Sequence, residues 1–281
     1  FEEEPPPADH PFLKAPNMVL TPHLGASTVE AQLSVAKEAA QLISDYLQKG
    51  VVGFAVNMPP IDRGELEEVR LYIDLARRLG LLLGQMAQGT LQKIKILYRG
   101  DVARLPSRLI TAAFAAGLLE TRIEGVNIVN APKLAEERGI EIISQTSSQK
   151  GDFSTLIKVD LETDRQPYTV AGTLFGHQYL RLVQLGDFHL DAYLDGLMLL
   201  FQHRDVPGLI GYIGTIFGKH KVNIAQMTVG RQVAGGEAIA VLNLDSPPTD
   251  AALQEVRAHP EISTVSMVKL PPAGEKPPWF G

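Results

Sequence analysis

The feature that most constrains the fold is the order of strand-like and helix-like segments in the last third of the chain. Short apolar runs typical of strands alternate there with segments of helical periodicity, in the order β-α-β-β-α-β. The predicted strands are residues 197–201, 222–229, 237–244 and 263–269, and the predicted helices are residues 208–220 and 250–258. This order is typical of a ferredoxin-like domain, which we expect at residues 196–281.

The middle of the chain, residues 57–195, predicts an α+β domain. Helical spacing of apolar residues and period-two alternation each recur, without an internal repeat. The predicted helices are residues 61–80, 107–120 and 132–138, and the predicted strands are residues 92–99, 140–145, 153–161, 168–174 and 180–185. Gly80 is expected to end the first of these helices.

Residues 1–56 read differently, as a loop, a short strand and one long helix. Residues 1–16 are acidic and rich in proline, which denies them regular structure, and residues 17–20 form a short apolar run. Ser27 and Glu30 match a capping box, so a helix should begin there and end before Gly50. His23 then lies just past the strand, on the side where ligands bind in parallel α/β sheets.

Composition narrows the function classes. The formal charge of −6 argues against a surface that binds nucleic acid, since such a surface is normally basic. The absence of cysteine rules out disulfides and thiolate metal sites. No run of about 18 apolar residues could span a membrane, and the start is unlike a signal peptide. We therefore expect a cytoplasmic protein. The seven histidines form no ligand motif, so no metal site is expected.

The stretch Thr21-Pro-His-Leu-Gly-Ala-Ser-Thr28, preceded by Phe1-Glu-Glu-Glu-Pro5, resembles the C-terminal signature of D-2-hydroxyacid dehydrogenases. The resemblance implies that His23 takes the substrate hydroxyl proton as hydride leaves for NAD, and that Glu4 pairs with it; Glu2 and Glu3 are the alternatives to Glu4. Imidazole suits this task because it titrates near neutrality. The alternative is that His23 is a loop residue that only makes a hydrogen bond and has no catalytic role.

The same resemblance implies a glycine-rich loop for NAD and an arginine for the substrate carboxylate. Neither motif is in this sequence, which has no G-x-G-x-x-G and opens on Phe1. We therefore expect no cofactor-binding residue in this chain, and a remnant of an α/β dehydrogenase core in residues 1–56. The chain alone should be inactive.

Residues 127–132, Asn-Ile-Val-Asn-Ala-Pro, and residues 170–176, Val-Ala-Gly-Thr-Leu-Phe-Gly, resemble the intervening domain of the long form of phosphoglycerate dehydrogenase. That domain implies a second anion site for substrate, for which Arg181 and His189 are candidates. The neighbouring positions that are arginine in some relatives hold Phe188 and Tyr193 here. The alternative for Arg181 is an ion pair with a nearby carboxylate.

The last domain resembles an ACT domain, an amino-acid-sensing module. In the phosphoglycerate dehydrogenase branch the effector is L-serine, held between two ACT domains, and the matching positions here are His203, Asp205 and Asn223. A carboxylate can pair with the ammonium group of the ligand, and an amide can both donate and accept a hydrogen bond. The N-terminus of a helix favours the ligand carboxylate. Alternatively, Asp205 only caps the helix and Asn223 only supports a turn.

Together these resemblances imply the C-terminal part of an NAD-dependent enzyme that oxidises 3-phosphoglycerate, with L-serine as effector and a homo-oligomer, tetramer or dimer, built through ACT and core domains. The rival is a non-catalytic amino-acid-binding regulator with a decayed dehydrogenase tail. Another 2-hydroxyacid dehydrogenase is the third possibility.

Overall fold

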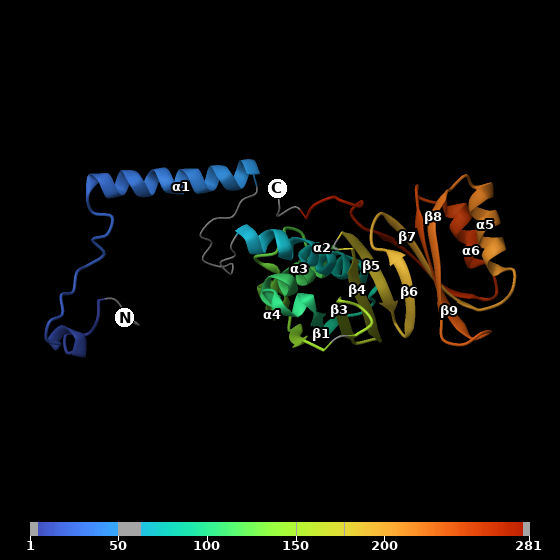
Figure 1. Cartoon of the computed structure of the whole chain (residues 1–281), viewed down its shortest axis with the longest axis horizontal. Coiled ribbons are helices and arrows are strands. Elements are labelled where there is room, and N and C mark those ends of the chain that lie inside the picture. The colour runs from blue at the N-terminus through green and yellow to red at the C-terminus, as the bar shows by residue number, and fades with distance from the viewer. Residues whose placement is uncertain (1–4, 50–62, 150, 177, 278–281) are drawn as a thin grey trace. The chain divides into compact units, whose positions relative to one another are not determined.

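The computed structural model describes residues 5–49, 63–149, 151–176 and 178–277. The chain divides into two compact units, one of residues 1–53 with 280–281 and the other of residues 54–279 (Figure 1). The first unit is built on one long helix. The second holds two β-sheets with helices and has the α+β character that the sequence predicts.

The first unit contains a 3₁₀ turn, η1 (Pro11–Lys14), and the helix α1 (Val29–Lys49). The predicted helix therefore forms, but Ser27 does not begin it. Thr28 lies directly before the first helical residue, and its Oγ1 accepts a 3.2 Å hydrogen bond from the Ala31 backbone N–H. Thr28 is thus the N-cap, because its hydroxyl satisfies a backbone N–H of the first turn.

The strand predicted at residues 17–20 is wrong. Asn17 adopts a left-handed conformation with φ 58°, and Val19 is 87% exposed. Residues 18–20 have no regular secondary structure, and among the described residues no strand pairs with them. A strand is stable only beside a neighbour that accepts and donates its backbone hydrogen bonds. An apolar pattern alone could not supply that neighbour.

The second unit opens with a mostly antiparallel six-stranded sheet in the order β2-β1-β3-β4-β5-β6. Its strands are β1 (Leu91–Gly100), β2 (Glu141–Ser147), β3 (Thr155–Thr163), β4 (Pro167–Phe175), β5 (Tyr179–Leu185) and β6 (Phe188–Tyr193). Only β1 and β2 pair in parallel within the described sheet. The strand β6 was not predicted from the sequence, although its inward residues Phe188, Leu190 and Ala192 alternate with exposed ones.

One face of this sheet is covered by α2 (Arg63–Met86) and α3 (Ser107–Glu120), while α4 (Ala131–Glu137) packs on α3 (Figure 1). The prediction that Gly80 ends its helix is wrong, because α2 continues to Met86. Gly80 lies where α2 meets α3, and a Cβ there would collide with Phe114 O and approach Leu118 N to 2.8 Å. Glycine serves this close helix contact instead of a helix end.

A second, four-stranded sheet follows in the order β10-β7-β9-β8. Its elements are β7 (Leu197–Arg204), α5 (Leu209–Lys219), β8 (Ile224–Arg231), β9 (Glu237–Leu244), α6 (Asp250–Arg257) and β10 (Ile262–Lys269). This confirms the predicted β-α-β-β-α-β order. Both helices pack on one face, where Phe201, Phe217 and Leu242 belong to the buried core.

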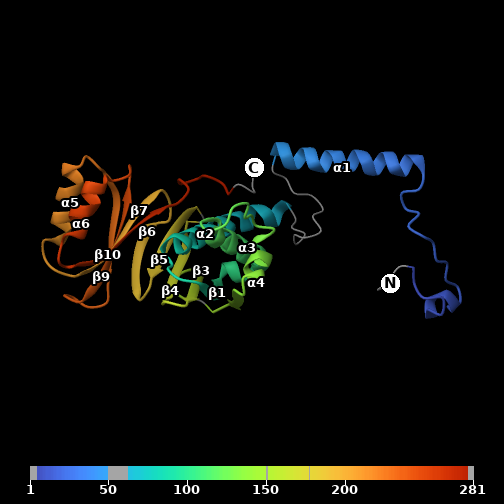
Figure 2. The same ribbon diagram turned by 180° about the vertical axis from the view of Figure 1, so that it is seen from behind.

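The other face of the four-stranded sheet is covered by the end of the six-stranded sheet. Met198, Leu200 and Val241 alternate with the helix-facing residues, yet they too are buried. Asn243 Nδ2 donates to the carbonyl oxygens of Tyr193 and Asp195, each at 3.1 Å. Figure 2 shows α5 and α6 on the far side of their sheet from β6. The two parts of this unit therefore share a packed and hydrogen-bonded interface.

Candidate functional site: a pocket at the end of β7

A pocket of about 220 Å³ lies where β7 gives way to α5. It is lined by residues from the end of β7, the loop after it, the first turn of α5 and the end of β8: His203, Asp205, Val206, Leu209, Ile210, Val229 and Arg231. Gly208 begins the helix with φ 90°, and no side chain caps the helix N-terminus. Backbone N–H groups of the first turn thus stay available to an anion in the pocket.

The ring of His203 carries an unused nitrogen. The side chain is 2% exposed, and Nδ1 lies 2.8 Å from the carbonyl oxygen of Arg204. A carbonyl oxygen only accepts, so Nδ1 carries the hydrogen and a neutral ring presents a lone pair at Nε2. Nε2 is buried and has no hydrogen-bond partner in the described structure. A buried polar atom without a partner is costly, so Nε2 offers a hydrogen-bond acceptor at this pocket.

Asp205 holds the neighbouring hairpin turn. Its Oδ2 accepts hydrogen bonds from Arg231 Nη1 at 2.6 Å and from the Gly235 backbone N–H at 3.2 Å, and its own N–H donates to Gly236 O. The hydrogen bond from Arg231 keeps the pKa of the Asp205 carboxyl below its ordinary value, with a smaller contribution from Gly235 N–H. Asp205 therefore does not cap α5, and it stays charged at neutral pH.

The structure brings His203 and Asp205 together but leaves Asn223 outside the pocket of this chain. Asn223 precedes β8, and its Nδ2 donates a 2.6 Å hydrogen bond to Asp245 Oδ2. Arg231 was not predicted from the sequence, where it comes 26 residues after its partner Asp205. No local pattern joins the two positions, because only the pairing of β8 with β9 carries Arg231 to this end of the sheet.

Comparison with known proteins shows which proteins and domains the chain is similar to. A model of the D-3-phosphoglycerate dehydrogenase intervening domain matches residues 68–186, and a model of the ACT domain matches residues 197–261. The chain is 36% identical over 272 residues to the D-3-phosphoglycerate dehydrogenase of Bacillus subtilis, which covers 96% of this chain and 52% of that enzyme. The similarity to D-3-phosphoglycerate dehydrogenases thus runs through nearly the whole chain, with an intervening-domain match followed by an ACT-domain match.

Two further D-3-phosphoglycerate dehydrogenases are similar to the chain in the same way. The D-3-phosphoglycerate dehydrogenase of Methanocaldococcus jannaschii is 32% identical over 271 residues, covering 96% of this chain and 51% of that protein. The D-3-phosphoglycerate dehydrogenase of Synechocystis is 37% identical over 256 residues, which cover 90% of this chain and 46% of that protein. The chain thus spans about half the length of the curated relatives, and it matches a C-terminal part of them.

Arg181, in the intervening domain, is engaged by its own neighbours. Its guanidinium carbon lies 3.8 Å from the Tyr193 ring centroid and 5.6 Å from the Phe175 ring centroid. Nη1 forms a 3.5 Å ion pair with Asp191 Oδ1, the alternative that the sequence left open. His189 is exposed on β6, and no hydrogen bond or ion pair joins it to Arg181 in the described residues. The two candidates therefore do not form one anion cradle in this chain.

The dehydrogenase signature lies in the first unit. His23 is exposed in the bend that precedes α1, and Glu4 lies outside the described residues. Within the described part of the chain, no group of three or more His, Asp or Glu residues could hold a metal ion. In the same residues, no helix combines the length and the apolarity that a membrane crossing requires.

Proposed function

We propose that this chain is the C-terminal part of an NAD-dependent D-3-phosphoglycerate dehydrogenase. The reaction is the oxidation of 3-phospho-D-glycerate to 3-phosphohydroxypyruvate in L-serine biosynthesis, in the cytoplasm. The similarity to dehydrogenases over 96% of the chain supports this proposal, and so does the Thr21–Thr28 signature. Residues 1–56 then belong to the catalytic core, residues 57–195 to the intervening domain and residues 196–281 to the ACT domain.

In this proposal His23 is the acid/base that holds the substrate hydroxyl proton, and Glu4 orients the imidazole. NAD would supply the hydride acceptor, but these residues do not form its cradle. A dinucleotide loop needs glycines two positions apart to admit the pyrophosphate, and no two glycines of this sequence have that spacing. We therefore place NAD on a part of the enzyme outside this chain.

The ACT pocket is the proposed site of feedback by L-serine. The carrying observation is the unpartnered Nε2 of buried His203, which can accept a hydrogen bond from the serine hydroxyl or ammonium. Asp205 adds a charged carboxylate, whose Oδ1 is not engaged by Arg231 or Gly235. The uncapped N-terminus of α5 favours the ligand carboxylate. Together these groups provide an interaction partner for each polar group of a small α-amino acid.

Asn223 enters the proposal through a second copy of the chain. It lies outside the pocket of its own chain, so it can contribute only across an interface between two ACT domains. We accordingly propose a homo-oligomer, a dimer or tetramer, that uses ACT and core domains. Sedimentation of the chain with and without L-serine tests this point, and a monomer that binds serine with full affinity would contradict it.

Calorimetric titration of the 281-residue chain with L-serine tests the effector site. We expect saturable binding that His203→Ala weakens at least tenfold, because the ligand loses its hydrogen-bond acceptor. His189→Ala, an exposed histidine outside the pocket, is the matched control and should bind as the wild type does. Absence of serine binding to the wild type, or equal binding to both variants, would remove the site.

The rival hypothesis, a non-catalytic regulator, includes the serine pocket but not the oxidation of 3-phosphoglycerate. An assay of enzyme turnover distinguishes the two hypotheses. The complete protein, with its upstream part, should reduce NAD in the presence of 3-phosphoglycerate, whereas this chain alone should not. A complete protein that binds L-serine but never reduces NAD would establish the regulator.

A further inference from the structure

Asp205 lies three residues before Gly208, the residue at which α5 begins, and it lines the same pocket as the first turn of that helix. The free backbone N–H groups at a helix N-terminus attract a nearby carboxylate. An unrestrained Asp205 would therefore bind these groups itself and compete with the carboxylate of a ligand. In the structure no side chain caps α5. The fold thus holds the Asp205 carboxylate away from the helix N-terminus.

The β8–β9 hairpin provides this restraint. Arg231, the last residue of β8, donates from Nη1 to Asp205 Oδ2 at 2.6 Å, and the Gly235 N–H donates to the same oxygen at 3.2 Å. The Asp205 N–H donates to Gly236 O at 2.8 Å, so the backbone of Asp205 is bound to the same turn. Of these three contacts to the hairpin, only that of Arg231 comes from a hairpin side chain. A substitution at Arg231 can therefore remove it selectively.

Arg231 is itself carried on an anchored stretch of backbone. On one side, β8 pairs with β9 as far as Arg231. Toward the intervening domain, Gly230 is so close to β6 that a Cβ there would lie 2.7 Å from His189 O. Gln232 Nε2 donates to Asp187 O at 3.3 Å. Both sequence neighbours of Arg231 thus contact the intervening domain, and its guanidinium reaches Asp205 from a fixed starting point.

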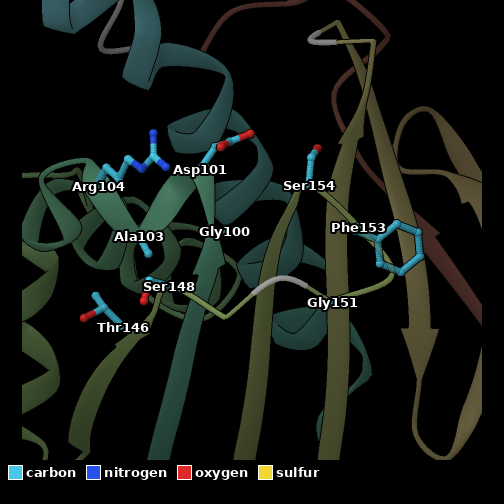
Figure 3. Close-up of a pocket in the computed structure, with 9 residues that line it drawn as sticks. All are labelled: Gly100, Asp101, Ala103, Arg104, Thr146, Ser148, Gly151, Phe153 and Ser154. Atoms are coloured by element: carbon cyan, nitrogen blue, oxygen red, sulfur yellow. The ribbon is translucent and has the colours of Figure 1, made fainter.

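A second pocket shows that an arginine and an aspartate do not pair merely because they line one cavity. This pocket, of about 520 Å³, lies at the end of β1 and includes Asp101 and Arg104 of the 3₁₀ turn η2 (Asp101–Arg104). Figure 3 shows both side chains on the same side of it. Among the described residues, no ion pair joins these two. Arg104 therefore offers a matched control for Arg231.

We propose that Arg231 is a positioning residue of the effector site, through which the pocket selects zwitterionic amino acids over simple anions. It holds the Asp205 carboxylate beside the N-terminus of α5 without letting it cap the helix. The ammonium of an amino acid then pairs with Asp205, and its carboxylate binds the free N–H groups. An anion without an ammonium meets the uncompensated repulsion of the fixed Asp205 charge. This inference rests on the proposed effector site at His203.

Calorimetric titration of the 281-residue chain with L-serine tests the role of Arg231. Arg231→Gln should weaken binding at least tenfold, because Asp205 is released toward α5. Arg231→Lys should bind within threefold of the wild type, since only Nη1 donates to Asp205 and lysine can supply one donor. Arg104→Gln should bind within twofold. The Arg231 side chain is 55% exposed, so the variants should melt close to the wild type.

Two further measurements separate positioning from simple charge. L-Glycerate has a hydroxyl where L-serine has its ammonium. A tenfold excess of L-glycerate should leave serine bound to the wild type but displace it from Asp205→Asn, which lacks the fixed charge. The double variant Asp205→Asn with Arg231→Gln should bind serine within threefold of Asp205→Asn alone, because Arg231 acts through Asp205.

The outcomes distinguish this inference from the serine site itself. Serine binding by Arg231→Gln within twofold of the wild type would overturn the positioning role and leave the serine site in place. Losses that multiply in the double variant would do the same. Displacement of serine from the wild type by L-glycerate would contradict the selection of zwitterions. A wild type that does not bind L-serine would remove the serine site and this inference together.

Discussion

Arg78, in α2 of the intervening domain, donates a 2.6 Å hydrogen bond from Nη1 to the carbonyl oxygen of Pro271, which follows the last strand of the ACT domain. The guanidinium is fully buried, and each of its five N–H donors has an acceptor. Those acceptors are Asp74 Oδ1 and the carbonyl oxygens of Leu194, Pro271, Pro272 and Glu275. One side chain of the intervening domain thus fixes both the segment that enters the ACT domain and the segment that leaves it.

Arg78→Met should lower the free energy of unfolding by about 3–5 kcal/mol, because it leaves buried acceptors and the Asp74 carboxylate without their partner. Burial raises the pKa of Asp74, and the Arg78 charge opposes that shift. Adding Asp74→Asn should therefore restore part of the loss. Urea denaturation measures both effects, with the exposed Arg257→Met as control. A loss below about 1 kcal/mol would show that the anchor is dispensable.

Two glycine substitutions should act in opposite directions. Gly80→Ala places a methyl group against the backbone of α3 and should destabilise by about 1–3 kcal/mol through overpacking. Gly214→Ala, in α5, meets nothing within 4 Å and should stabilise by about 0.5–1 kcal/mol, since alanine loses less entropy in a helix. Thermal melts of the two variants measure the contrast. Stabilisation by Gly80→Ala would contradict the close contact of α2 with α3.

The contribution of Asp205 to stability should be flat across neutral pH. Its pKa is lowered in the folded chain by the Arg231 hydrogen bond, so the folded state binds its proton less readily than the unfolded state. The stabilisation is complete above the ordinary aspartate value of about 4 and is lost as the pH falls through the folded pKa. Asp205→Asn should thus lower Tm equally at pH 6 and pH 8. A penalty that appears only above pH 7 would refute the Arg231 pair.

The proton-transfer role of His23 is testable only in the complete enzyme. His23→Ala should reduce kcat by about two to four orders of magnitude, the usual contribution of a general acid or base. The melting temperature should hardly change, since His23 is exposed in this chain. Steady-state assays with 3-phosphoglycerate and NAD provide the measurement. A loss below threefold would leave His23 as a structural loop residue.

Two elements illustrate how far local patterns reach. The predicted strand 237–244 and the predicted helix 107–120 match β9 and α3 at both ends, because both are nearly continuous apolar runs that are buried along most of their length. The predicted strand at residues 17–20 does not form, because it has no pairing partner among the described residues, and Gly80 does not end its helix. Both errors share a cause: a partner distant in sequence decides what an apolar run or a glycine does.

The residues of the candidate functional site likewise fall into those that the sequence predicted and those that only the fold brings together. His203, at the end of β7, and Asp205, in the loop that follows, were predicted from the resemblance to an ACT domain, and they line one pocket because they are close in sequence. Arg231 was not found, because its contact with Asp205 depends on the register of β8 beside β9.

The sequence by itself determined the order of elements in the last domain, the similarity to D-3-phosphoglycerate dehydrogenases and the residue types at His203 and Asp205, since periodicity and short motifs are local properties of the chain. Tertiary structure alone decided the rest. It closed the pocket with Arg231, turned Arg181 onto Asp191 and Tyr193, and placed Arg78 between two domains. The physical reason is that ion pairs, buried donors and cavities depend on distances between segments, and only packing sets those distances.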